Sequence, residues 1–144
     1  MELKFSDLAF PDDLFYLIEH QVWARFDSDT LATVGITSLG IALAGEIYMC
    51  RPKAQGTAVE QGKSVAVVEL AKSIVSVKSP LSGVVLETNP LLPSAPETVH
   101  TDPYGAGWIA RLGITPSESG CNALVHGAAV MAAMAEHARL FRIE

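Results

Sequence analysis

Residues 62–83 read GKSVAVVELAKSIVSVKSPLSG, and Lys72 stands near the middle of this stretch. Two short runs rich in β-branched residues flank the lysine, at 64–68 and at 74–77. Such runs favour β-strands because branched side chains fit a pleated, half-buried surface. The five residues between them have the length of a hairpin connection. The stretch therefore predicts a β-hairpin that holds Lys72 at its tip, clear of the body of the protein.

A single lysine at the tip of a rigid hairpin suggests a covalent attachment point more than a catalytic base. Most lysines are solvated surface charges, so the hairpin alone leaves both interpretations open. The rest of the chain has to decide between them.

Composition indicates one domain, residues 1–144, of which 49% are hydrophobic and 18% charged. Such a chain can bury a real hydrophobic core. The net charge is −6 and the ten lysines and arginines are scattered, which disfavours a nucleic-acid partner. No apolar run approaches the length of a membrane span. The acidic N-terminal segment is unlike a secretory or transit peptide, so we expect a cytoplasmic protein.

Short strands separated by turns predict a compact β sandwich or barrel, mainly β with a small helical content. Thr37 offers a hydroxyl to cap a short helix that ends at Gly45. A long loop rich in proline follows at 89–107, and the tail from about 117 to 144 has helical periodicity, divided at Gly127. In that tail we expect Leu124, Ala128, Met131 and Ala135 on one face, with 130, 134 and 138 widening it. The predicted strands are 14–18, 22–26, 30–34, 47–50, 64–68, 74–77, 84–87 and 108–112.

No arrangement of residues typical of an enzyme occurs in the sequence. The motifs G-x-S-x-G, G-x-G-x-x-G and the P-loop are absent. The four histidines share no metal-ligand spacing with one another or with Cys50 and Cys121, although His126 and His137 would share a helical face. We interpret each cysteine as a small buried hydrophobic residue. The chain therefore looks like a protein acted upon, not a catalyst.

Four segments, together spanning about 11–124, resemble the lipoyl-carrying H protein of the glycine cleavage system and its paralogues. They are PDDL at 11–14 with Glu19, His20 and Trp23; VGIT at 34–37 leading to GEI at 45–47; VVELAK at 67–72 followed by SPLSG at 79–83; and DPYGAGW at 102–108. The last two are the most specific, since one supplies the acyl-lysine hairpin and the other a loop expected to close beneath it. The resemblance implies a flattened hybrid barrel-sandwich of the lipoyl and biotinyl carrier type, with short C-terminal helices.

The resemblance places Lys72 at the position that carries lipoate through an amide bond. Biotin carriers usually flank their lysine with methionine, whereas Ala71 and Ser73 stand here, so lipoate is favoured. Glu69 is typical of H-type carriers and is a candidate for recognition by the lipoylating enzyme. An arm of this kind would reach about 14 Å.

Several residues after the lysine, Ser73 to Lys78, depart from glycine-cleavage H proteins. They are similar to H-like lipoate-binding proteins of a heterodisulfide-reductase-like sulfur oxidation pathway, and the sequence favours that role. The alternative is an H protein that carries the aminomethyl group between glycine decarboxylase, aminomethyltransferase and dihydrolipoamide dehydrogenase. A third interpretation is an interaction module that kept the fold without the lipoyl group.

Overall fold

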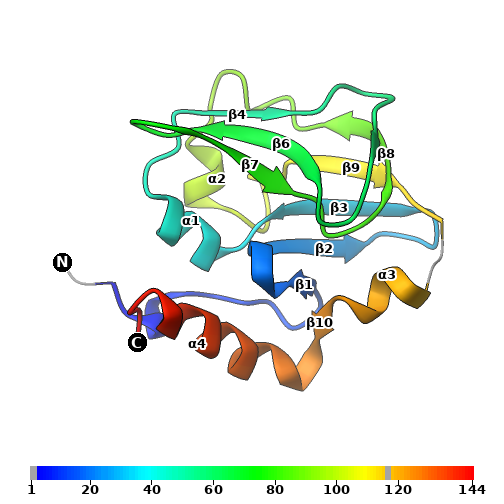
Figure 1. Cartoon of the computed structure of the whole chain (residues 1–144). Coiled ribbons are helices and arrows are strands. Elements are labelled where there is room, and N and C mark those ends of the chain that lie inside the picture. Colours follow the sequence, from blue (N-terminus) through cyan, green and yellow to red (C-terminus); the bar gives the residue numbers. More distant parts are fainter. Residues whose placement is uncertain (1–2, 116–117) are drawn as a thin grey trace.

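The computed structural model describes residues 3–115 and 118–144, and it consists of two β-sheets with short helices around them (Figure 1). One sheet has seven strands in the order β10-β1-β2-β3-β9-β8-β5, and the other has three in the order β4-β6-β7. This architecture confirms the predicted class, mainly β with a small helical content. The strands are β1 (Phe15–Leu17), β2 (Val22–Phe26), β3 (Leu31–Ile36), β4 (Met49–Pro52), β5 (Ala58–Val59), β6 (Ser64–Glu69), β7 (Ile74–Lys78), β8 (Gly83–Thr88), β9 (Ala110–Gly113) and β10 (Val125–His126). The α-helices are α1 (Ser38–Ala44), α2 (Thr98–Thr101), α3 (Glu118–Asn122) and α4 (Val130–Leu140), with 3₁₀ turns η1 (Phe5–Asp7), η2 (Ile18–His20) and η3 (Gly127–Ala129).

The larger hydrophobic core lies between the two sheets. The three-stranded sheet contributes Val65, Val68 and Val77, and the seven-stranded sheet contributes residues such as Val34 and Leu112, all nearly inaccessible to solvent. Because side chains alternate along a strand, each strand of the small sheet buries one face and exposes the other. The small sheet is thereby fixed on the large one, and its hairpin extends beyond the core at the upper left of Figure 1.

A second core lies on the other face of β1 and β2, where α4 covers it (Figure 1, red helix). Trp23 and Tyr16 are fully buried there, packed with Val130, Met134 and Ala138 of α4. The predicted helical face was wrong in phase. Met131 is 53% exposed and Ala135 also faces solvent, while residues 130, 134 and 138 form the buried stripe.

Helix α1 forms as its sequence predicts. The Thr37 hydroxyl oxygen accepts a hydrogen bond from the Gly40 N–H at 3.0 Å, and it donates to Oε1 of buried Gln21 at 2.6 Å. The helix ends at Gly45, whose φ of 78° lies in the left-handed region that glycine tolerates. The predicted cap and stop are both confirmed.

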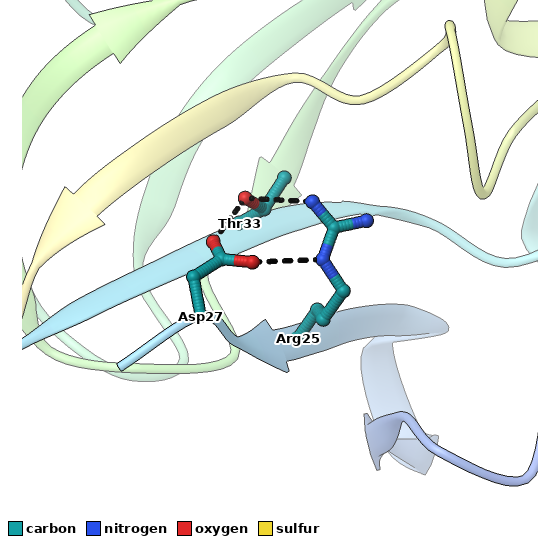
Figure 2. A network of polar contacts seen from close by, with 3 residues as sticks. All are labelled: Arg25, Asp27 and Thr33. Carbon is teal, nitrogen blue, oxygen red and sulfur yellow. Dashed lines mark hydrogen bonds and ion pairs between the residues drawn. The ribbon is translucent and has the colours of Figure 1, made fainter. Parts of the chain in front are cut away.

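A polar network closes the turn between β2 and β3 (Figure 2). The Arg25 guanidinium donates to Asp27 Oδ1 at 2.9 Å and to Thr33 Oγ1 at 3.3 Å, while the Thr33 hydroxyl donates to Asp27 Oδ2 at 2.6 Å. Burial raises the pKa of Asp27, but the hydrogen bonds from Thr33 and Arg25 and the positive charge of Arg25 outweigh it. The pKa of Asp27 is therefore lowered.

Some predicted boundaries and elements differ from the structure. The loop at 89–107 contains helix α2, and the two-residue strands β5 and β10 were not predicted. His126 lies in β10, not on a helix shared with His137, and its ring stacks on Phe15 with 4.0 Å between centroids. The predicted tail begins at residue 117, which lies outside the described residues; α3 and α4 occupy most of the chain beyond that point.

Candidate functional site

Lys72 is exposed in the turn that joins β6 to β7. Glu69 and Ile74 form the last residue pair of the hairpin, and the Leu70 N–H donates to the Ser73 carbonyl at 2.9 Å to close the turn. Lys72 forms no ion pair with any carboxylate in the described part of the chain. Its amine is therefore open to approach from outside the molecule.

The base of the hairpin is tied down by hydrogen bonds from outside its own two strands. Gln61 Nε2 donates to the Pro80 carbonyl at 2.9 Å and to the Gly120 carbonyl of α3 at 2.8 Å. The Gly62 N–H donates to the Ser79 carbonyl at 2.8 Å. These contacts hold both ends of the hairpin in place, so that the tip extends from a fixed base.

Glu69, the second residue singled out in the sequence, lies on the outer face of the small sheet. Its carboxylate pairs with the Arg51 guanidinium of β4 at 3.2 Å, and both side chains keep contact with solvent. Met49 and Ile74 are its direct neighbours across the two strand pairs. Glu69 is thus at the surface, three residues before Lys72, as part of an ion pair.

Apolar side chains surround the tip, and sequence patterns alone do not assign them to the site. Ile74 is 69% exposed, Val75 44% and Tyr48 50%. In the sequence, Ile74 and Val75 stand out only as departures from the family pattern. Tyr48 reaches the site through the pairing of β4 with β6, because its N–H donates to the Glu69 carbonyl at 2.8 Å.

The loop at 102–108 lies against Trp23 and the start of α1. Trp23 Nε1 donates to the carbonyls of Pro103 and Ile36, both at 3.1 Å. The Tyr104 hydroxyl donates to the Ala9 carbonyl at 2.5 Å and accepts from the Ser38 N–H at 2.9 Å. The loop thus stabilises the body of the protein below the sheet that carries the hairpin.

A histidine links this region to the small sheet. The Ile47 N–H donates to His100 Nε2 of α2 at 2.9 Å, just before β4 begins. The support that the loop region gives to the hairpin is therefore indirect, through His100 and β4.

The two cysteines have different environments. Cys50 is buried in the main core, and burial raises the pKa of its thiol to about 12. Cys121 is exposed, so the prediction that both cysteines are buried was wrong for Cys121.

The described residues contain no group of three or more histidine, cysteine or acidic side chains that could hold a metal ion. No helix in the part of the chain that the structure describes is long and apolar enough to cross a membrane.

Comparisons with known proteins agree with this geometry. The chain is 41% identical over 109 residues to glycine cleavage system H protein 2 of Aquifex aeolicus, covering 76% of this chain and 68% of that protein. It is 43% identical over 102 residues to the glycine cleavage system H protein of Laribacter hongkongensis, covering 71% and 80%. It is 35% identical over 133 residues to probable glycine cleavage system H protein 2 of Sulfurisphaera tokodaii, covering 91% and 89%.

A solved structure of a glycine cleavage system H protein is also similar to this chain. The crystal structure of a glycine cleavage system H protein from Mycobacterium marinum matches with a TM-score of 0.70 and 28% identity, over 92% of this chain and 98% of that one. This match confirms the flattened barrel-sandwich fold. These relatives carry the glycine cleavage name, which supports that role better than the sulfur-oxidation role favoured by the sequence. The profile of the glycine cleavage H-protein family matches residues 14–137, and the chain belongs to that family.

Proposed function

We propose that this chain is the lipoate-bearing carrier of a glycine cleavage system, with the lipoyl group joined by an amide to Nζ of Lys72. The observation that carries the proposal is the exposed Lys72 in the hairpin turn of an H-family chain. An attachment lysine has to be reached by the modifying enzyme and must then leave its arm free to move. An exposed turn beyond the core meets both requirements.

The role of the protein's own residues is to present the arm. The hydrogen bonds of Gln61 and Gly62 hold the hairpin base, and Lys72 supplies the attachment point. With a reach of about 14 Å, the arm can enter a partner's active site while the carrier stays outside. Tethering in this way raises the effective concentration at each partner. The lipoyl group supplies the disulfide and dithiol chemistry by which an H protein takes up and passes on the aminomethyl group.

The proposed partners are the lipoylating enzyme and the three glycine cleavage enzymes: glycine decarboxylase, aminomethyltransferase and dihydrolipoamide dehydrogenase. We propose that the chain carries the lipoyl-bound group and does not itself catalyse a reaction, because its candidate site is a single lysine amine on a hairpin. The cytoplasm is the proposed compartment, as expected from the sequence.

Intact mass spectrometry tests the attachment. The protein from a lipoate-replete host should carry one lipoyl increment, which Lys72→Arg removes. Lys63→Arg is the matched control, because Lys63 is also exposed and lies at the base of the same hairpin; this variant should keep the increment. An unmodified, functional wild-type protein would contradict the proposal and favour a module without lipoate.

A reconstituted glycine decarboxylation assay tests the pathway. Lipoylated wild-type protein should support release of CO₂ from glycine in the presence of glycine decarboxylase, and Lys72→Arg should not. A fully lipoylated protein that supports no release would count against glycine cleavage and for the sulfur-oxidation role.

A further inference from the structure

Two β-branched apolar side chains follow the candidate attachment lysine and point to opposite faces of the hairpin. Ile74 shares the outer face with Glu69 and Met49, as the strand register requires, while Val75 lies on the other face. They are 69% and 44% exposed. Single exposed apolar residues are ordinary, but here two stand close after the one residue that has to enter another protein's active site.

The charges next to Ile74 are already compensated. Glu69 is bound to Arg51 at 3.2 Å, so the outer face beside Ile74 carries a neutral pair. A protein that covers this face can therefore bury Ile74 without leaving an unpaired carboxylate behind. The surface suits an apolar contact more than a charged one.

Reach distinguishes the proteins that must touch these residues. An enzyme that acylates Lys72 has to bring its acyl donor to bonding distance of Nζ, and Ile74 lies only two residues away along the chain, at most about 7 Å between Cα atoms. A protein that reacts with the far end of a loaded arm can stand off by about 14 Å. Close approach to the residues around Lys72, Ile74 and Val75 among them, is thus required of the first kind of enzyme only.

We propose that Ile74 and Val75 form the contact surface for the enzyme that acylates Lys72, an enzyme with an apolar rim around its acyl channel. This inference rests on the proposed function. In the reaction, the bond from the acyl carbon to its activating group, an adenylate, breaks and the C–N bond to Nζ forms. The leaving adenylate takes the electron pair of the broken bond, and the ammonium releases two protons to solvent in becoming the amide nitrogen. The apolar rim binds Ile74 and Val75 while the eight-carbon acyl chain fills the channel beside them.

The test measures acylation of the unmodified full-length protein by a purified lipoate–protein ligase with lipoate and ATP. Initial rates at several carrier concentrations, followed by intact mass, give kcat and KM. For Ile74→Asp we expect kcat/KM to fall about tenfold, mainly through KM, as for the loss of one buried apolar contact. Ile74→Val should stay within about twofold, because it keeps a branched apolar side chain.

Leu140→Asp is the matched control, since Leu140 is 73% exposed but lies at the end of α4, on the far side of the seven-stranded sheet (Figure 1). It should be acylated like the wild type. Ile74→Asp that has been lipoylated by prolonged incubation should be reduced by dihydrolipoamide dehydrogenase and NADH within about twofold of the wild-type rate, because the arm spans the distance.

Acylation of Ile74→Asp at the wild-type efficiency would overturn the inference. An equal loss in the acylation and reduction assays would also overturn it, because the surface would then be a general docking site. A wild-type protein that is not acylated at Lys72 at all would instead refute the proposed function. Thermal unfolding of each variant tests whether a measured loss comes from misfolding.

Discussion

Replacing Trp23 by phenylalanine tests the claim that this indole joins the loop at 102–108 to the body of the protein. Trp23 is fully buried, and its Nε1–H is shared between the carbonyls of Ile36 and Pro103, each at 3.1 Å. Phenylalanine removes the donor and leaves two carbonyls in a water-poor site, at a cost of about 1–3 kcal/mol. The missing ring leaves a cavity that adds roughly 1 kcal/mol.

The free energy of unfolding should therefore fall by about 2–4 kcal/mol. At this chain length such a loss lowers Tm by roughly 7–13 °C. Urea unfolding followed by circular dichroism gives the free energy, and calorimetry gives Tm. Two-state behaviour is checked by whether the unfolding transitions followed by circular dichroism and by calorimetry are consistent with each other.

Trp108→Phe is the control, since Trp108 is only half-buried. Its ring lies under the Arg111 guanidinium, with 4.5 Å between the ring centroid and Arg111 Cζ. A phenyl ring keeps that contact, so the loss should be about 1 kcal/mol or less. The reasoning fails if Trp23→Phe costs no more than Trp108→Phe.

Two other predictions concern acid stability and thiol reactivity. Because the pKa of Asp27 is lowered in the folded state, its stabilisation is complete above the unfolded-state pKa and is lost as pH falls below about 4. Thr33→Val removes one hydrogen bond to that carboxylate, so the midpoint of acid unfolding should move to higher pH; an unchanged midpoint in a pH titration of the circular dichroism signal would contradict the network. With a thiol reagent at pH 8, exposed Cys121 should react quickly and Cys50, whose burial raises its pKa to about 12, only after denaturation. Two fast thiols in the native protein would show that the core is open.

Local patterns in the sequence predicted much of the fold. Strand β2 occupies the predicted residues, and the hairpin of β6 and β7 forms around Lys72 as expected. The Thr37 cap and the Gly45 stop also follow from residues close in sequence. In each case the interactions that decide the structure lie within a few residues of one another, so the sequence pattern alone contains them.

Elements that depend on distant partners could not be predicted in the same way. Strands β5 and β10 have two residues each and exist only because β8 and β1 pair with them. The choice of Met134 over Met131 as the buried methionine depends on how α4 packs against Trp23 and Tyr16. Helical periodicity marks an apolar stripe but does not give its rotation to within one residue.

The candidate site also combines features set by nearby residues with features set by distant ones. The exposure of Lys72 follows from the hairpin, but the ion pair of Glu69 with Arg51 and the position of Tyr48 depend on the register of β4 against β6. That register is set by the shared core and by the His100 link to Ile47, neither of which appears as a sequence motif.

The two sheets also differ in when a growing polypeptide can complete them. The three-stranded sheet uses the continuous segment from Met49 to Lys78, whereas the large sheet needs β1 near the N-terminus and β9 and β10 beyond residue 109. Since nearby segments find each other sooner than distant ones, we expect the hairpin sheet to assemble first on the ribosome. Its apolar side can pack on β2 and β3, which have already emerged, but the core stays incomplete until β9 emerges. We expect the nascent chain to be most exposed to aggregation during that interval.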